Sequence, residues 1–112
     1  MKLERELLRG AGPAAVLAQL AVGEAYGYEL VQALDRKTGG VLAMGQSTLY
    51  PMLNHLEATK LIASREKVVN GRTRRYYRLT PKGKRKLAAD RAQQTALHEA
   101  LGAMGLLKPG GA

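Results

Sequence analysis

The dipeptide Asn70-Gly71 constrains the fold of this chain more than any other feature of its sequence. It separates two runs rich in residues typical of strands, 61–69 and 74–79. A two-residue hairpin turn needs positive φ angles, which asparagine and glycine tolerate best. The sequence therefore predicts a β-hairpin with its tip at residues 70 and 71. Tyr76 and Tyr77 must face opposite sides of the second strand, so one of them belongs to the core.

Helical spacing dominates the first part of the chain. Leucines four residues apart predict a helix over residues 2–9. The glycines and proline of residues 10–13 should interrupt it, and proline suits the first turn of a second segment over 13–22. Another helix is expected over residues 27–37, bounded by glycines on both sides.

The segment 47–59 has one strongly apolar face, formed by Leu49, Met52, Leu53 and Leu56. Ser47, Asn54 and His55 fall on the opposite face. Pro51 lacks the N–H that an interior helical turn needs. We therefore expect Ser47 or Thr48 to cap this helix, which places Pro51 at or just past the first turn.

A final helix is expected over residues 81–106. Thr80 and Pro81 are residue types preferred at the cap and the first helical position. The tail, residues 107–112, should fray. One stripe of the helix follows the spacing of a coiled-coil seam: Leu87, Gln94, Leu97, Leu101 and Met104. This stripe predicts a homodimer, and the alternative is that it packs only on its own domain.

The positive charge of the chain is localised. The net charge is +9, and residues 60–91 hold 12 of the 18 basic residues but only two acids. Such a patch is typical of proteins that bind a polyanion, although a basic surface without a specific partner is the alternative. Four cations open the last helix, where they oppose the helix dipole, so a DNA backbone would explain them: Lys82, Lys84, Arg85 and Lys86.

Several classes of function find no support in the sequence. The chain has no cysteine, and its two histidines, His55 and His98, have no ligand cluster around them. Nucleophile elbows, phosphate loops and carboxylate pairs are missing, so we expect no enzyme activity, no cofactor and no metal site. No secretory signal or apolar membrane span is visible, and a cytoplasmic location is expected.

The order helix, helix, helix, hairpin is that of a winged helix-turn-helix. We therefore expect a mainly α fold with a small β-hairpin and a C-terminal dimerisation helix. Residues 1–80 would form the DNA-binding domain, residues 81–106 the dimerisation helix and residues 107–112 a flexible tail. The third helix would enter the major groove of double-stranded DNA, and the hairpin would meet phosphates or the minor groove.

The chain resembles the PadR family of transcriptional regulators over about residues 5–87. Five segments carry the resemblance in order: ELLRG at 6–10, YGYEL at 26–30, STLYPML at 47–53, LEATKLI at 56–62 and GRTRRYYRLTPKG at 71–83. STLYPML is the most specific of them. The single short C-terminal helix is similar to the compact branch of the family.

The resemblance implies a homodimeric repressor on a pseudo-palindromic operator, with the 47–59 helix in the major groove and the 70–75 wing on the backbone or in the minor groove. With the residue chemistry it gives these candidate DNA contacts: Tyr28, Gln46, Ser47, Thr48, Tyr50, Asn54, His55, Arg72, Arg74 and Arg75. The hydroxyls of Ser47 and Thr48 suit phosphate, and Asn54 suits adenine. Plain capping, core packing of the tyrosines and a solvated Asn54 are the alternatives.

Two positions depart from the family pattern, which usually has glycine where this chain has Ser47 and Lys60. Lys60 removes a favoured helix stop, so the start of the hairpin is expected to differ. Some members of the family respond to small aromatic molecules at the dimer interface, which leaves room for an effector of unknown identity. The lack of Trp and Phe here weakens that binding mode.

Two other classes of function remain open from the sequence. A structural RNA-binding protein would share the charge and size, but it usually offers more aromatic residues for base stacking. A protein-interaction module would use the C-terminal helix without nucleic acid. Neither requires the spacing of a helix-turn-helix.

Overall fold

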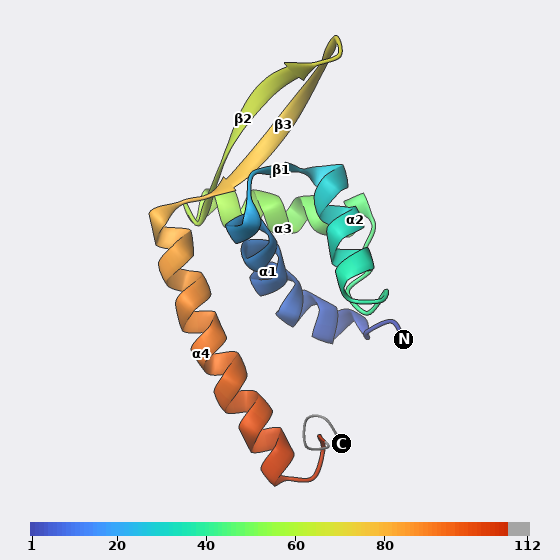
Figure 1. Cartoon of the computed structure of the whole chain (residues 1–112), viewed down its shortest axis with the longest axis vertical. Coiled ribbons are helices and arrows are strands. Elements are labelled where there is room, and N and C mark those ends of the chain that lie inside the picture. Colours follow the sequence, from blue (N-terminus) through green and yellow to red (C-terminus); the bar gives the residue numbers. More distant parts are fainter. Residues whose placement is uncertain (108–112) are drawn as a thin grey trace.

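The computed structural model describes residues 1–107 and contains, within them, four helices and one three-stranded sheet (Figure 1). In chain order these are α1 (Arg5–Val22), β1 (Ala25–Tyr26), α2 (Gly27–Lys37), α3 (Gln46–Ala58), β2 (Ile62–Val69), β3 (Arg72–Leu79) and α4 (Pro81–Ala103). The first three helices form the body, the β2–β3 hairpin projects from it, and α4 extends in the opposite direction (Figure 1). The predicted fold class, mainly α with a small β-hairpin, is confirmed.

The hairpin has the predicted turn. β2 and β3 pair antiparallel from Ile62 opposite Leu79 to Val69 opposite Arg72. Asn70 and Gly71 both have positive φ angles, 52° and 76°. We call residues 62–79 the wing. A third strand was not predicted: β1 pairs with β3 and places Ala25 opposite Tyr77. Two residues are too few to show the alternation by which strands are recognised.

The predicted break in the first helix is wrong, because α1 is one continuous helix that includes Pro13. The reason lies in tertiary packing. Leu8, Gly12 and Val16 are buried along one face of α1, and Gly12 lies directly against Met52 of α3. A Cβ atom at Gly12 would lie 2.7 Å from the terminal methyl of Met52. The helix therefore continues through Pro13, because the face of α1 with Leu8, Gly12 and Val16 is buried. It loses only the hydrogen bond that Pro13 cannot donate.

α3 begins earlier than predicted. Gly45, not Ser47 or Thr48, is its N-cap, and the Gly45 carbonyl accepts hydrogen bonds from the N–H groups of Thr48 and Leu49. Pro51 therefore lies in the second turn and leaves the carbonyl of Ser47 without its helical donor. The hydroxyls of Ser47 and Thr48 make no capping bond, which leaves them exposed for other partners.

Lys60 does not alter the start of the wing. Its φ angle is 66°, the left-handed conformation that glycine would adopt after a helix. The N–H of Lys60 bonds to the carbonyl of Glu57, and the N–H of Leu61 bonds to the carbonyl of Leu56. These two bonds are the usual helix stop, so lysine takes the glycine geometry at a strain of roughly 1 kcal/mol.

The core contains one of the two adjacent tyrosines. Tyr77 is 3% exposed and belongs to the core cluster, which also contains leucines of all three body helices, whereas Tyr76 lies partly exposed on the opposite face of β3. The apolar face of α3 is buried as predicted, with Leu49, Leu53 and Leu56 inside. This burial fixes which face of α3 is left for a partner.

α4 begins as predicted but ends earlier. The Thr80 hydroxyl caps it by accepting a hydrogen bond from the N–H of Gly83 at 3.0 Å, and Pro81 is the first helical residue. The helix ends at Ala103, not at residue 106, because Gly105 turns left-handed and the N–H of Leu106 bonds back to Leu101. Most of the predicted tail, residues 108–112, lies outside the described residues. Within residues 1–107, no helix has the length and apolar character needed to cross a membrane.

Candidate nucleic-acid interface

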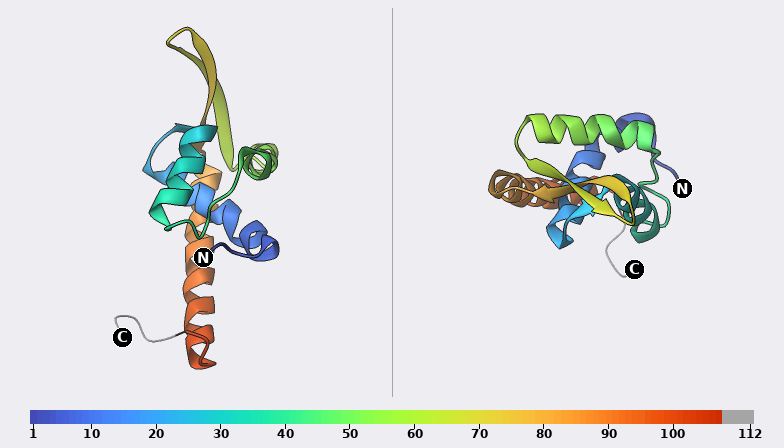
Figure 2. Two further views of the ribbon diagram at one scale, coloured as in Figure 1. Left: turned by 90° about the vertical axis from the view of Figure 1, so that its right-hand side faces the viewer. Right: turned by 90° about the horizontal axis from the view of Figure 1, so that it is seen from above.

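The outward face of α3 holds most of the predicted contact residues. Gln46, Ser47, Thr48, Asn54 and His55 are all exposed there. Viewed from the side, α3 is seen nearly end-on at the edge of the body, with the wing above it (Figure 2, left). No part of the described chain covers this polar face, so it is open to a partner.

Tyr50 lies on the flank of α3 that faces the start of α2. A Cβ atom added to Gly27 would lie 2.7 Å from the Tyr50 hydroxyl, so this close approach requires glycine. Tyr50 is 40% exposed and Tyr28, the next residue of α2, is 50% exposed. Tyr50 therefore packs against the start of α2 and also reaches solvent.

The three arginines predicted for the wing do not form one cluster. The pairing register turns Arg75 and Tyr77 to one face of the hairpin and Arg72, Arg74 and Tyr76 to the other. Arg75 donates to the Ser64 hydroxyl at 2.9 Å and to the Glu66 carboxylate at 3.1 Å. Ser64 in turn donates to Glu57 of α3. This face of the wing is thus linked to α3.

Arg74 is held on the opposite face. Its guanidinium lies 4.6 Å from the centre of the Tyr26 ring, and Tyr26 meets Tyr76 edge to face at 5.4 Å. Lys67 covers the Tyr76 ring at 4.5 Å. Arg72, next to the turn, is exposed and makes no ion pair or side-chain hydrogen bond with the described residues. Of the three wing arginines predicted to contact DNA, Arg72 is therefore the most available to an external anion.

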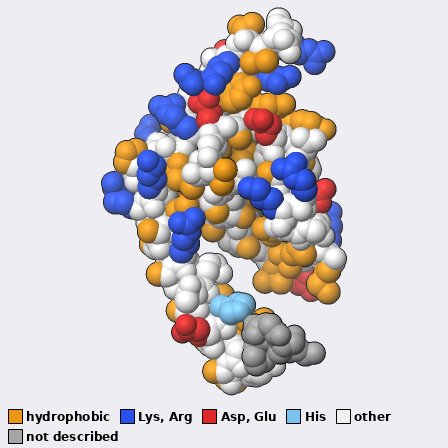
Figure 3. All heavy atoms as spheres, viewed as in Figure 1, with side chains coloured by type: hydrophobic (Ala, Val, Ile, Leu, Met, Phe, Trp, Pro, Cys, Tyr) orange, Lys and Arg blue, Asp and Glu red, His pale blue; other side chains and the backbone are white. Residues whose placement is uncertain are grey.

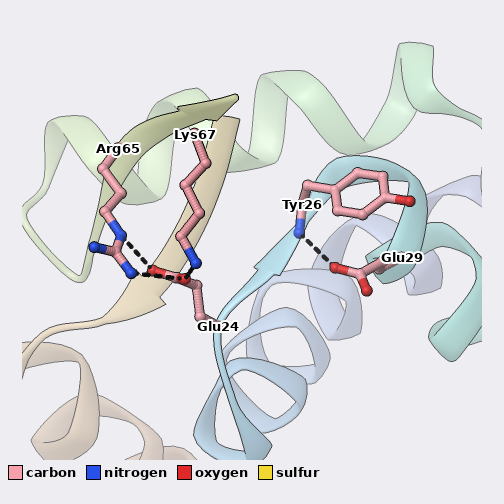
Figure 4. Close-up of polar contacts among 5 residues, drawn as sticks. All are labelled: Glu24, Tyr26, Glu29, Arg65 and Lys67. Atoms are coloured by element: carbon pink, nitrogen blue, oxygen red, sulfur yellow. Dashed lines mark hydrogen bonds and ion pairs between the residues drawn. The ribbon is translucent and has the colours of Figure 1, made fainter. Parts of the chain in front are cut away.

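Glu24 fastens the wing to the body (Figure 4). Its carboxylate accepts hydrogen bonds from Arg65 at 3.0 and 3.1 Å and pairs with Lys67 at 2.5 Å. Hydrogen bonds from Arg65 and Lys67 lower the pKa of Glu24 to about 2 from an ordinary value of 4.5. Two residues on, the Tyr26 N–H donates to Glu29 at the start of α2 (Figure 4). We call this contact of Glu24 with Arg65 and Lys67 the clamp. No local sequence pattern indicates it, because Glu24 and Arg65 lie 41 residues apart.

The low pKa of Glu24 predicts a pH dependence of folding. A carboxylate whose pKa falls on folding contributes stability that is complete above pH 4.5 and is lost as the pH falls towards 2. In urea titrations we expect Glu24→Gln to be less stable than the parent at pH 7. The difference should shrink between pH 4.5 and pH 2. A difference that stays constant over this range would mean that the charge of Glu24 does not hold the wing.

Lysines and arginines gather on the wing and along the first part of α4 (Figure 3). Two of the four cations that open α4 have partners in the protomer. Lys82 donates to the Thr59 carbonyl at the end of α3 at 2.9 Å, and Lys86 pairs with Asp90 at 2.6 Å. A DNA backbone is therefore not required to explain these two. Lys84 and Arg85 are exposed and make no ion pair with the described residues.

The predicted dimerisation stripe is divided by the fold. Leu87 is buried in the core of its own protomer and borders a groove lined by alanines of α1. Beyond Asp90, every α4 residue from 91 to 100 is exposed. Leu97 is 51% exposed, and Gln94 and Met104 are exposed as well, whereas Leu101 is partly covered. Residues 1–107 leave this half of α4 uncovered, so its apolar side chains remain available for an interface. In the same range, no three His, Cys, Asp or Glu side chains lie together in a way that could hold a metal ion.

Comparison with known proteins places this geometry in a family. Residues 16–89 match the sequence model of the transcriptional regulator PadR-like family. A transcriptional regulator of Mycobacterium tuberculosis is 41% identical over 99 residues, which cover 88% of this chain and 90% of that protein.

Two solved structures relate the fold to regulators. A PadR family transcriptional regulator from Eggerthella lenta superimposes with a TM-score of 0.78 at 36% identity, over 92% of this chain and 88% of that one. Bacillus subtilis PadR in complex with operator DNA gives a TM-score of 0.64 at 27% identity, over 69% of this chain and 44% of that one.

Proposed function

This chain belongs to the PadR-like family of transcriptional regulators, and we propose that it is a homodimeric repressor that binds a pseudo-palindromic DNA operator. Residues 1–80 would bind DNA, and α4 would join two protomers. The operator-bound Bacillus subtilis PadR supports DNA as the partner. The family is one of transcriptional regulators, and no catalytic activity is indicated.

The observation that carries the proposal is the uncovered polar face of α3 beside a basic wing. A helix whose buried face is apolar and whose outer face offers hydroxyl, amide and imidazole groups suits the major groove. In this arrangement Ser47 and Thr48 hold a phosphate, while Asn54 and His55 reach base edges. The hydroxyls of Tyr28 and Tyr50 meet the backbone on the wing side of α3, and Gln46 lies at the start of the same face.

Dimerisation supplies the second half of the recognition. Two copies of α3 would read half-sites about one helical turn of DNA apart, so the operator would be pseudo-palindromic. The exposed half of α4 is the proposed contact, through Gln94, Leu97, Leu101 and Met104. Leu87 supports this interface only from within the core.

The wing contributes charge, and Arg72 is the most available of the three arginines predicted to contact DNA. Phosphate contacts carry no base information, so Arg72→Ala should weaken binding to specific and scrambled duplexes by the same factor. The slope of log K against log salt should flatten by about 0.9 for each phosphate that the variant no longer neutralises. Arg74→Ala serves as a comparison, because its side chain already contacts Tyr26. If Arg72→Ala changed the preference at a single base pair, a backbone role would be wrong.

The base-reading role of α3 can be tested by selecting duplexes from a random pool. The parent protein should enrich a pseudo-palindrome with half-sites about one turn apart. Asn54→Ala should lose preference at one position of each half-site, worth roughly 1–3 kcal/mol, because the amide pairs with adenine. A selected sequence identical to that of the parent would show that Asn54 is only a solvated surface residue.

A further inference from the structure

A groove of about 830 Å³ lies on the side of α3 opposite Tyr50, between α3 and the N-terminal end of α1. Lys2, Arg5 and Arg9 line it from the α1 side, and Thr48 and His55 line it from α3. The segment before α1 is held in place, because the N–H of Leu3 bonds to the Val41 carbonyl and its side chain packs against the core. The groove is therefore a fixed part of the surface next to the proposed recognition helix.

The three cations have no evident role within the protomer. All three are exposed, and none forms an ion pair with the described residues. Arg5 is the first residue of α1, where positive charge opposes the helix dipole and does not stabilise the helix; Lys2 precedes the helix and Arg9 lies one turn further on. The nearby acids Glu4 and Glu6 do not line the groove. An anion from outside the protomer would complement this side.

The position of this protein groove beside α3 indicates that the anion is a DNA backbone. In the side view, α3 lies below the level of the wing and above the N-terminal end of α1, and α3 and this end of α1 are on the same side of the molecule (Figure 2, left). The major groove of DNA is about 12 Å wide and is bordered by two phosphate backbones. With α3 in that groove, the wing and Tyr50 lie towards one backbone, and the cations of α1 lie towards the other.

We propose that Lys2, Arg5 and Arg9 bind the DNA backbone on the side of the major groove opposite the wing. This inference rests on the proposed function and adds a second basic surface, outside the segment 60–91 that holds most of the charge. Thr48 and His55 then lie between the bases and this backbone, so His55 contacts a phosphate as readily as a base. Contacts with both backbones then fix the register of α3 in the major groove of DNA.

The test compares two charge-matched double variants on a duplex that carries the selected operator and on a scrambled duplex. Arg5→Gln with Arg9→Gln should weaken binding to specific and scrambled duplexes alike, on the order of tenfold, and flatten the salt slope by about two units per protomer. Arg36→Gln with Lys37→Gln removes the same charge from the end of α2, which lies away from α3, and should leave the slope unchanged (Figure 2). Circular dichroism checks that both variants fold.

Hydroxyl-radical footprinting then locates the contact. The Arg5/Arg9 variant should lose protection of the backbone on one side of each half-site, and Arg72→Ala should lose it on the other. Parent-like slope and footprint in the Arg5/Arg9 variant would overturn the inference. Decanoate is the probe for a small amphiphilic anion. If it raised the melting temperature of the parent but not of the Arg5/Arg9 variant, and this variant bound DNA like the parent, the groove would belong to such an anion and the inference would be overturned. If the parent itself bound no duplex, the proposed function would fail instead.

Discussion

Changing Leu97 to glutamate should convert the protein from a dimer to a monomer and weaken operator binding by about 10²–10⁴-fold. Leu97 is half exposed in the protomer and lies in the part of α4 that the rest of the described chain leaves uncovered. A carboxylate at that place is tolerated by a monomer but must be desolvated in an apolar dimer interface, which is unfavourable. Without the dimer, each α3 binds its half-site alone, and the gain from simultaneous binding is lost.

Sedimentation velocity gives the oligomeric state, and fluorescence anisotropy gives the affinity of the same samples. Leu97→Met is the matched control, because it keeps an apolar side chain of similar volume and should remain dimeric. Circular dichroism of Leu97→Glu should match that of the parent, since the side chain is exposed in the protomer. A Leu97→Glu protein that stayed dimeric would exclude this stretch of α4 as the interface.

Gly83→Ala should have the largest effect on folding. A Cβ atom at Gly83 would lie 2.0 Å from the Leu61 carbonyl oxygen and 2.8 Å from Cδ1 of Leu79. The first turn of α4 is fixed against the start of β2, because the Thr80 hydroxyl also bonds to the carbonyls of Lys60 and Leu61. The backbone must shift to admit a methyl group, at about 3 kcal/mol or more. The midpoint of thermal unfolding should fall by roughly 10 °C or more.

Gly102→Ala is a control in the same helix. Among the described residues, nothing lies within 4 Å of a Cβ atom at that position. Alanine there should leave stability unchanged or raise it by up to about 1 kcal/mol, because it favours the helix. Equal melting temperatures for Gly83→Ala and the parent would show that α4 does not approach Leu61 so closely.

Features set by short stretches of sequence were predictable. The Asn70-Gly71 turn, the Thr80 cap and the apolar face of α3 each depend on a few neighbouring residues, and all three are present. The separation of Arg75 from Arg72 and Arg74 also follows from the alternation of a strand. The sequence alone therefore contained this separation.

Features set by contacts between distant residues were not predictable. α1 continues through Pro13 because α3 covers its face, and β1 exists because β3 lies beside it. The clamp at Glu24 depends on cations that β2 brings back to the end of α1. The division of α4 into a buried start and an uncovered remainder also required the position of α1. These contacts decide how the wing and α3 are presented together.

In the proposed function, α3 reads a DNA sequence. The most direct test is fluorescence anisotropy with duplex DNA from upstream of the protein's own gene and with a scrambled duplex, at several salt concentrations. We expect the upstream duplex to bind at least about a thousandfold more tightly than the scrambled duplex, with one dimer per duplex. Equal binding of both duplexes with a steep salt slope would contradict it, because the basic surface would then act through charge alone.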